Sequence, residues 1–217
     1  MITAKASEKS YELVPAGSHV ARCIQMVELG TLTEVFQGET KSLHKVRITW
    51  ELPLELKVFN PEKGEQPFII SKEYTLSLHE KSTMRKDLQS WRGKAFTEEE
   101  ASSFDITKLL GVPAMINVIH QTSKNGGVYS NVASVSPLPK GTTCPPQINP
   151  TFVLSYDDFD FKKFDSLPEW LQEKMQTTPE YHRVSNPKTI QGVVNTLPTV
   201  DDLPFILFIP LLTSFLI

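Results

Sequence analysis

The chain has 217 residues, of which 40% are hydrophobic, and a net charge of −3 at neutral pH. This length and apolar content suffice for one packed domain with additional segments, and the charge excludes a chain that is basic throughout. The charge is uneven, because residues 1–140 hold 17 lysines and arginines against 16 acids, whereas residues 141–217 hold 5 against 9. Acidic segments tend to repel themselves and stay solvated. We therefore expect one domain over residues 1–140 and an acidic linker and tail over residues 141–217.

Cys23 and Cys144 are the only cysteines, and residues 1–10 contain no apolar stretch that would serve as a signal peptide. We therefore expect two free thiols in a cytoplasmic protein. The sequence has no CxxC or HxxxH spacing, so we expect neither a metal site nor another cofactor. It also lacks the GxSxG, HExxH and phosphate-binding glycine patterns of common enzymes, and we expect no catalytic site.

Three strands are predicted in the first part of the chain. Residues 19–27 are rich in β-branched side chains, and Gly30 ends this strand. Residues 43–52 alternate between apolar and polar side chains, which predicts a strand with one dry face and one basic, solvent-facing side. Residues 68–78 continue with apolar side chains at period two. The dry face of the second strand holds Val46, Ile48, Trp50 and Leu52, and its basic face holds Lys45, Arg47 and Thr49.

The hydrophobic period then changes to that of helices. Ser82 or Thr83 can cap a first helix. Thr97 and Glu100 have the spacing of a capping box for a second, short helix, which continues or restarts through residues 106–110. The apolar positions that recur at helical spacing in the first helix are Met84, Leu88 and Trp91.

Residues 114–120 and 128–135 predict a final pair of strands, joined by the hairpin sequence Lys124-Asn125-Gly126-Gly127. The order is therefore three strands, a helical insert and two strands. This is the element order of the OB-fold, a five-stranded Greek-key barrel with a helix between strands 3 and 4. We predict an all-β fold of this class with a helical insert, and another small barrel or sandwich is the alternative.

After Pro137 the sequence changes character, because prolines and a glycine interrupt residues 139–150 and predict a linker. One short helix is predicted over residues 168–175, where Pro168 suits a first turn. From Thr177 onward, further prolines and a glycine predict an extended, flexible tail. The apolar residues of the short helix are Trp170, Leu171 and Met175.

A barrel of this class can hold a single strand of nucleic acid, with cations for the phosphates and aromatic rings for unstacked bases. Lys45 and Arg47 are the first candidates, because they project from the basic face of the second strand, near where OB-folds receive oligonucleotides. Trp50 and Trp91 have core-like spacing, so we do not expect them to stack on bases. The further candidate cations are Lys72, Arg85, Lys86 and Lys124, and the candidate stacking rings are Phe36 and Tyr129.

Near the end of the chain stands the sequence Val200-Asp201-Asp202-Leu203-Pro204-Phe205. It resembles the acidic tip of bacterial single-stranded DNA-binding proteins, where aspartates are followed by an aliphatic residue, Pro and Phe. The resemblance implies that this tip binds partner proteins of replication and repair, with an apolar pocket for the ring and basic rims for the aspartates. The residues assigned to this role are Asp201, Asp202, Leu203, Pro204 and Phe205.

Five segments of the body resemble phage-encoded OB-fold single-stranded DNA-binding proteins. They are VPAGSH at 14–19, ELG at 28–30, RITWELP at 47–53, SLHEKS at 77–82 and VSPLPKG at 135–141. The similarity covers about two-thirds of the chain. It implies sequence-independent binding of single-stranded DNA during phage replication and recombination, in the cytoplasm of the host cell.

One departure from the bacterial pattern follows Phe205. In that family the Phe ends the chain and its carboxylate is part of what the partner recognises, whereas here twelve almost wholly apolar residues, 206–217, follow. This run is shorter than the about 20 residues of a membrane span, and Pro210 interrupts it, so we expect no membrane attachment. An extension past an ancestral stop, a segment that folds back on the barrel and an oligomer contact are the open interpretations.

Two other functions stay open at this point. An OB-like adaptor would bind a replication or recombination partner through its tail and have little affinity for DNA. A nuclease would need a cluster of carboxylates, for which Glu73, Glu80 and Asp87 are the candidates. The sequence does not determine the oligomeric state, and a homo-oligomer is one alternative.

Overall fold

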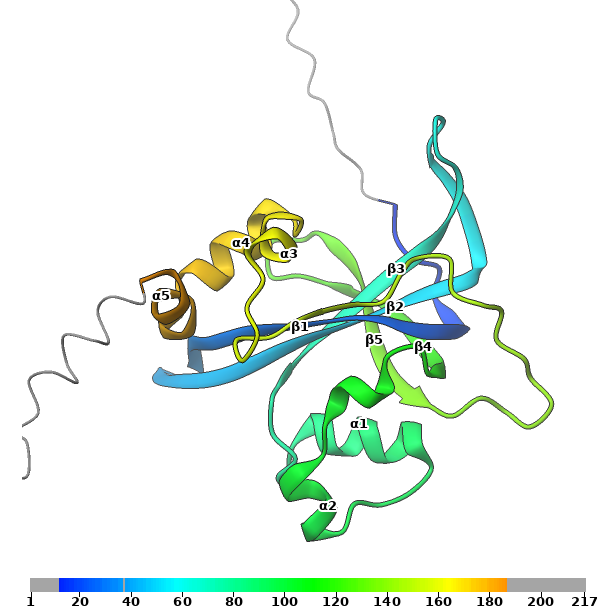
Figure 1. The fold of residues 1–217 in the computed structure, drawn as a ribbon. Coiled ribbons are helices and arrows are strands. Elements are labelled where there is room, and N and C mark those ends of the chain that lie inside the picture. The colour runs from blue at the N-terminus through cyan, green and yellow to red at the C-terminus, as the bar shows by residue number, and fades with distance from the viewer. Residues whose placement is uncertain (1–11, 37, 187–217) are drawn as a thin grey trace, which may run out of the picture.

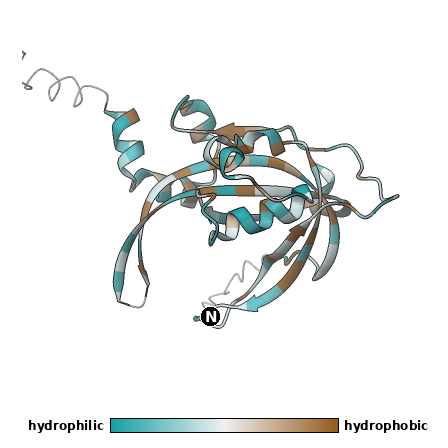
Figure 2. Ribbon diagram, turned by 90° about the horizontal axis from the view of Figure 1, so that it is seen from below, coloured by the Kyte–Doolittle hydropathy of each residue, from teal (hydrophilic) through white to brown (hydrophobic). Residues whose placement is uncertain are grey.

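Five long strands form a curled antiparallel sheet in the computed structural model, which describes residues 12–36 and 38–186 (Figure 1). The strands are β1 (Gly17–Phe36), β2 (Glu39–Asn60), β3 (Gly64–Thr75), β4 (Pro113–Thr122) and β5 (Val128–Ser136). They lie in the order β3-β2-β1-β4-β5, and a short strand, β6 (Phe152–Leu154), pairs in parallel with β1. The described chain is thus mostly β, and Figure 2 shows how the long strands curve into an open half-barrel.

The curvature is linked to irregularities in the central strand. The pairing of β1 with β2 shifts between Cys23 and Gln25 and again between Glu28 and Gly30. Such bulges bend a strand and increase its right-handed twist. Gly30 has a φ of 86°, and a Cβ at this position would lie 2.7 Å from Thr178 Oγ1. Only glycine therefore fits the second bulge without strain.

The inner face of the sheet carries the main hydrophobic core. Val46, Ile48, Trp50 and Leu52 of β2 are all buried, which confirms the dry face predicted for this strand. The ring of Trp50 lies 5.8 Å from the ring of Trp91, centroid to centroid. Both indoles therefore belong to the core, as predicted from their spacing.

Three helical elements follow β3 in the chain: α1 (Thr83–Arg92), α2 (Glu98–Ser103) and the 3₁₀ helix η1 (Ile106–Leu109). The Ser82 side chain caps α1 by accepting a hydrogen bond from the Met84 N–H, and Gly93 ends the helix in the left-handed conformation. Thr97 and Glu100 form a reciprocal capping box at the start of α2. Both caps lie where the sequence predicts them, and α1 packs against β3 and β5.

β2 and β3 continue beyond the rest of the sheet as a two-stranded arm, which projects from the body in Figure 1. β1 pairs with β2 only as far as Glu51, whereas β2 and β3 pair as far as Asn60 and Gly64. We call residues 54–69 the β2–β3 arm. Its large apolar side chains that are exposed are Leu54, Leu56, Val58, Phe59 and Ile69.

The outer face of β1 is covered by the C-terminal part of the described chain. This part contains β6 and three short helices, α3 (Phe161–Asp165), α4 (Glu169–Gln176) and α5 (Pro179–Ser185). A second hydrophobic core joins them to the strand, so β1 is buried on both faces. The members of this core are Val27, Leu29, Leu32, Leu154, Phe164, Leu167, Leu171 and Met175.

This region has more structure than the sequence predicts. α4 coincides with the short helix expected over residues 168–175, but β6, α3 and α5 replace parts of the expected linker and extended tail. The prolines do not interrupt these helices, because Pro168 is the N-cap of α4 and Pro179 lies in the first turn of α5. The expectation of a flexible chain from Thr177 is therefore wrong for residues 179–185.

The segment before β6 is also fixed to the sheet. Glu51 is completely buried on the outer face of β2, where its carboxylate accepts hydrogen bonds from the Ile148 N–H at 2.7 Å and the Asn149 N–H at 3.0 Å. Arg22 donates to the backbone carbonyls of Cys144 and Pro145. Residues 144–149 therefore lie across β1 and β2, although they have no regular secondary structure.

The acidic tip Asp201–Phe205 and the apolar residues 206–217 lie outside the described residues. Among the residues that are described, no helix has the length and apolar character needed to cross a membrane. Cys23 and Cys144 are both free thiols, as predicted.

Candidate nucleic-acid interface

The predicted basic face of β2 is the outer face of the sheet. The register of β2 and β3 places Lys45 opposite Thr75 and Arg47 opposite Glu73. Thr49, on the same face, is buried and shares a hydrogen bond of 2.9 Å with the Ser71 hydroxyl. The polar residues therefore lie where alternation predicts, but this part of the outer face is only partly open to solvent.

The two leading candidate cations are each paired with a carboxylate. Lys45 forms an ion pair with Glu34 of β1, and Arg47 Nη1 lies 3.4 Å from Glu73 Oε1. Burial lowers the pKa of Arg47, and Glu73 opposes this effect. Glu73 also binds Lys174 of α4, with 2.6 Å between Oε2 and Nζ. The basic, solvent-facing side predicted for this strand is therefore not purely basic, because acids from β1 and β3 lie beside its cations.

Lys72 does not extend this face. It follows Ile70 and precedes Tyr74 at period two, so it lies on the inner side of β3, where Nζ is 2.7 Å from Asp87 Oδ2 of α1. The Tyr74 hydroxyl donates to the same carboxylate oxygen at 2.9 Å. Burial and the nearby Asp87 raise the pKa of Tyr74. Lys72 therefore joins β3 to α1 and lies on the opposite face of the sheet from Lys45 and Arg47, and its role as a nucleic-acid contact stays a prediction.

Arg85 is also structural. Its side chain is only 8% exposed and donates hydrogen bonds to the carbonyls of Leu78 and Phe96 and to the Glu98 carboxylate. These contacts fasten the loops on both sides of α1. Arg85 is therefore not the accessible cation that the sequence suggests, because a guanidinium can satisfy several buried carbonyls at once.

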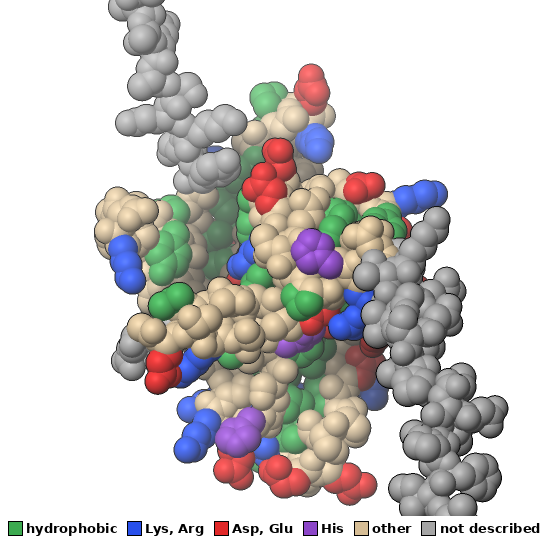
Figure 3. Space-filling view, turned by 90° about the vertical axis from the view of Figure 1, so that its left-hand side faces the viewer, with side chains coloured by type: hydrophobic (Ala, Val, Ile, Leu, Met, Phe, Trp, Pro, Cys, Tyr) green, Lys and Arg blue, Asp and Glu red, His purple; other side chains and the backbone are tan. Residues whose placement is uncertain are grey.

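The remaining candidates are distributed over several elements. Lys86 is exposed on α1, and Lys124 is exposed in the turn between β4 and β5. Tyr129 of β5 is also exposed, and its hydroxyl donates to Gln121. Phe36 ends β1, and its side chain lies outside the described part of the structure. On the face shown in Figure 3, basic side chains are interspersed with acidic ones and do not form one patch.

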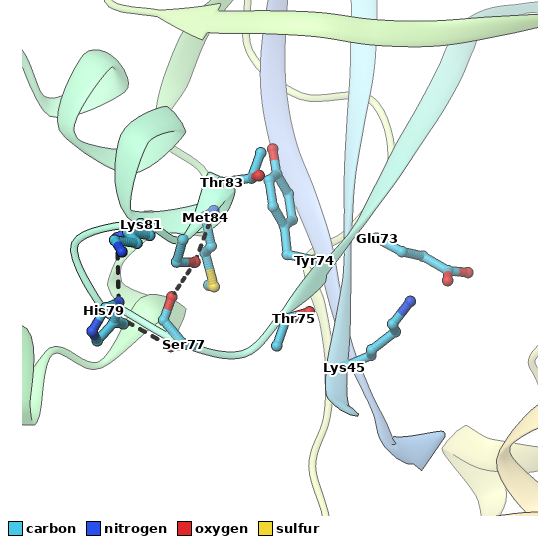
Figure 4. A pocket seen from close by; sticks show the side chains of 10 residues that line it. Lys45, Glu73, Tyr74, Thr75, Ser77, His79, Lys81, Thr83 and Met84 are labelled. Carbon is cyan, nitrogen blue, oxygen red and sulfur yellow. Dashed lines mark hydrogen bonds between the residues drawn. The ribbon is translucent and has the colours of Figure 1, made fainter. Parts of the chain in front are cut away.

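A groove of about 490 Å³ opens beside the end of β3 (Figure 4). Lys45 and Glu73 line it from the sheet, and the loop between β3 and α1 closes the other side. The loop is held in shape by hydrogen bonds, such as that from the Ser82 hydroxyl to the Ser77 carbonyl at 2.6 Å. The remaining lining residues are Tyr74, Thr75, Ser77, His79, Lys81, Ser82, Thr83 and Met84.

The groove is polar, and its cationic and ionisable groups outnumber its one carboxylate, that of Glu73. Lys45, His79 and Lys81 supply positive or ionisable groups, and the hydroxyls of Thr75, Ser77 and Thr83 supply further donors. The sequence gives no reason to group Lys81 with Lys45. Both line the groove because the chain turns after β3, and in Figure 4 the Lys45 side chain points away from the loop that carries His79 and Lys81.

Trp170 of α4 is a further exposed aromatic residue beside this face. Its indole is 50% exposed, and the guanidinium carbon of Arg47 lies 4.9 Å from the ring centre. In the sequence, Trp170 is grouped with the apolar residues Leu171 and Met175. In the structure those two are buried and Trp170 is not. Helical spacing could have shown the difference, since residues one position apart point in different directions.

The carboxylates considered for a nuclease do not form one cluster. Glu73 lies on the outer face with Arg47, whereas Asp87 faces Lys72 and Tyr74 on the inner side. Within residues 12–36 and 38–186, no group of three or more His, Cys, Asp or Glu side chains is arranged to hold a metal ion. The chain matches no protein-family model and no curated protein sequence.

Proposed function

We propose that the chain is an OB-fold protein that binds single-stranded DNA without sequence preference. The strand order β3-β2-β1-β4-β5, the antiparallel pairing of β1 with β4 and the helices between β3 and β4 support this assignment. β3 and β5 also approach each other at the two edges of the sheet. A five-stranded, partly open Greek-key barrel has these features.

The observation that carries the proposal is the groove between β3 and α1. OB-folds bind oligonucleotides on the face of strands 2 and 3, between the loops that join strands 1–2 and 4–5. Here the groove lies at β2 and β3 and is lined by Lys45, His79 and Lys81. Lys124 in the turn between β4 and β5 and the ring of Tyr129 in β5 are exposed as well, in the region that corresponds to the second of these loops.

The ion pair of Lys45 does not prevent this function. Its partner Glu34 is 45% exposed, whereas the Lys45 side chain is 14% exposed. The carboxylate therefore remains in contact with water, and a phosphate that replaces it keeps Lys45 paired with an anion. Arg47 is 23% exposed against 14% for Lys45, and both Glu73 and Trp170 contact it.

Fluorescence anisotropy of labelled oligo-dT, titrated with the full chain at two salt concentrations, tests the proposal. We expect affinity that falls with salt, by about 0.7 logarithmic units per tenfold change for each phosphate contacted. The double variant Lys45→Gln and Lys81→Gln should bind more weakly and show a shallower salt dependence. The matched control is Lys63→Gln with Lys140→Gln, two exposed cations outside the groove. Absence of salt-sensitive binding by the unmodified chain would exclude the function.

The biological setting is a further part of this proposal. The resemblance to phage single-stranded DNA-binding proteins suggests replication or recombination of phage DNA in the host cytoplasm. The acidic tip Asp201–Phe205 would recruit partner proteins there. Deletion of residues 201–217 should then abolish capture of a partner while oligo-dT binding is retained.

A second candidate function is an adaptor with little DNA binding of its own. The exposed apolar side chains of the β2–β3 arm favour it, because contiguous exposed apolar surface marks protein interaction sites. The pairing of Lys45 and Arg47 with acids is consistent with it as well. The same titration separates the two functions, since an adaptor would leave oligo-dT unbound at both salt concentrations.

A further inference from the structure

The three tryptophans of the chain differ sharply in exposure. Trp50 is 1% exposed and Trp91 is 4% exposed, and both pack in the main core. Trp170 is 50% exposed. Trp170 is therefore the tryptophan whose ring is available to a ligand, on a helix whose other apolar residues are buried.

The position of Trp170 is well determined by its helix. Leu171 and Met175 anchor α4 in the second core, and Lys174 binds Glu73 of β3 at 2.6 Å. The indole is thereby placed over Arg47, whose guanidinium carbon lies 4.9 Å from the ring centre. Arg47 is oriented in turn by Glu73. The ring is thus fixed on the outer face of β2 and β3.

This arrangement adjoins the groove. Glu73 lines the groove and also contacts both Arg47 and Lys174. A polynucleotide that leaves Lys45 along the outer face therefore meets Arg47, Lys174 and the exposed part of the indole. Cations for phosphates beside an aromatic ring for a base are the two elements of sequence-independent single-strand binding.

We propose that Trp170 is a platform on which an unpaired base stacks, with Arg47 supporting the ring and Lys174 near the adjoining phosphate. This inference depends on the proposed function and extends its site onto the C-terminal helices. The ligand is single-stranded nucleic acid, since only unpaired bases offer a free ring face to the indole.

Intrinsic fluorescence gives a direct test with unlabelled oligo-dT. Because Trp50 and Trp91 are buried, quenching on addition of the oligonucleotide reports mainly on Trp170. We expect quenching that saturates at the dissociation constant measured by anisotropy. An oligonucleotide of the same length with abasic sites retains the phosphates but not the bases, and it should bind more weakly without comparable quenching.

Substitutions of Trp170 distinguish stacking on a base from mere shielding of Arg47 from solvent. Trp170→Ala should weaken oligo-dT binding about 5- to 150-fold, the range for loss of one base–aromatic stack. Trp170→Phe should retain most of the affinity. Trp170→Leu still covers Arg47 with apolar surface but cannot stack, so it should bind as weakly as the alanine variant. Thermal melting of each variant checks that the fold is unchanged.

The outcomes distinguish this inference from the function on which it depends. Unchanged affinity of Trp170→Ala, together with unquenched fluorescence, would overturn the platform and leave DNA binding intact. Full affinity of Trp170→Leu would also overturn it, because cover alone would then suffice. If the unmodified chain binds no oligo-dT by anisotropy, the proposed function itself fails.

Discussion

Leu171→Ala should release the C-terminal helices from the outer face of the sheet while the main core stays folded. Leu171 is 2% exposed and lies in the second core with Val27 and Leu29 of β1. Replacement of a buried leucine by alanine costs about 2–5 kcal/mol, the lost transfer free energy plus the cavity left behind. The second core has only eight buried residues, so this loss is large relative to what holds the layer in place.

The expected result is local opening rather than global unfolding. A loss of about 3 kcal/mol raises the open fraction of the layer by about 150-fold. Hydrogen exchange of the amides in α4 and α5 should accelerate by this factor, and limited proteolysis should cut within residues 150–186. Amides of β2 and β4 should keep their protection, because their side chains belong to the main core.

Two matched variants make this experiment decisive. Glu173→Ala changes an exposed residue of the same helix and should alter stability by no more than about 0.5 kcal/mol. Leu88→Ala removes a buried leucine of the main core and should accelerate exchange throughout the sheet. If Leu171→Ala exchanges like Glu173→Ala, the C-terminal helices are not held by the second core and our account of the covered outer face is wrong.

Two further predictions concern titratable groups. Burial raises the pKa of Cys23 to about 12. With a thiol reagent at pH 8, the native protein should therefore react at Cys144 but not at Cys23, whereas both thiols should react in denaturant. Rapid labelling of Cys23 in the native state would contradict its burial. Burial raises the pKa of Glu180, but hydrogen bonds from the Thr31 N–H and hydroxyl lower it overall, below 4.5. The stability that this carboxylate contributes is therefore complete above its unfolded pKa and lost as the pH falls through the folded value. Proteolysis of α5 should increase only in acid, and this acid dependence should be weaker in Glu180→Gln.

The sequence predicted best those features that depend on a single strand or a single turn. The alternation of β2 predicts the buried set around Trp50, and the hydroxyls of Ser82 and Thr97 predict two caps. These features depend on residues within a few positions of each other. The period of two along β3 would also have placed Lys72 on the inner face, since it lies two residues from both Ile70 and Tyr74.

Long-range features could not be predicted in this way. The ion pair of Arg47 depends on the register with β3, and the contacts of Glu73 with Lys174 join residues 101 positions apart. The second core depends on Val27 and Leu29, which make β1 apolar on both faces. A strand covered on both sides reads as a nearly continuous apolar run, so the loose alternation of β1 is itself the signal that another layer lies on the sheet.

The two candidate binding surfaces, the groove beside Lys45 and the β2–β3 arm, lie at opposite ends of β2. α5 is held to Thr31 of β1, which pairs with His44, and the next residue, Lys45, lines the groove. The β2–β3 arm lies at the other end of the same strand, and the rise from Lys45 to Asn60 is about 50 Å. In Figure 1 the arm accordingly lies at the upper right of the sheet and α5 at its left end. A protein bound to the apolar arm would therefore leave the groove accessible to DNA, and we expect the two to bind without competition.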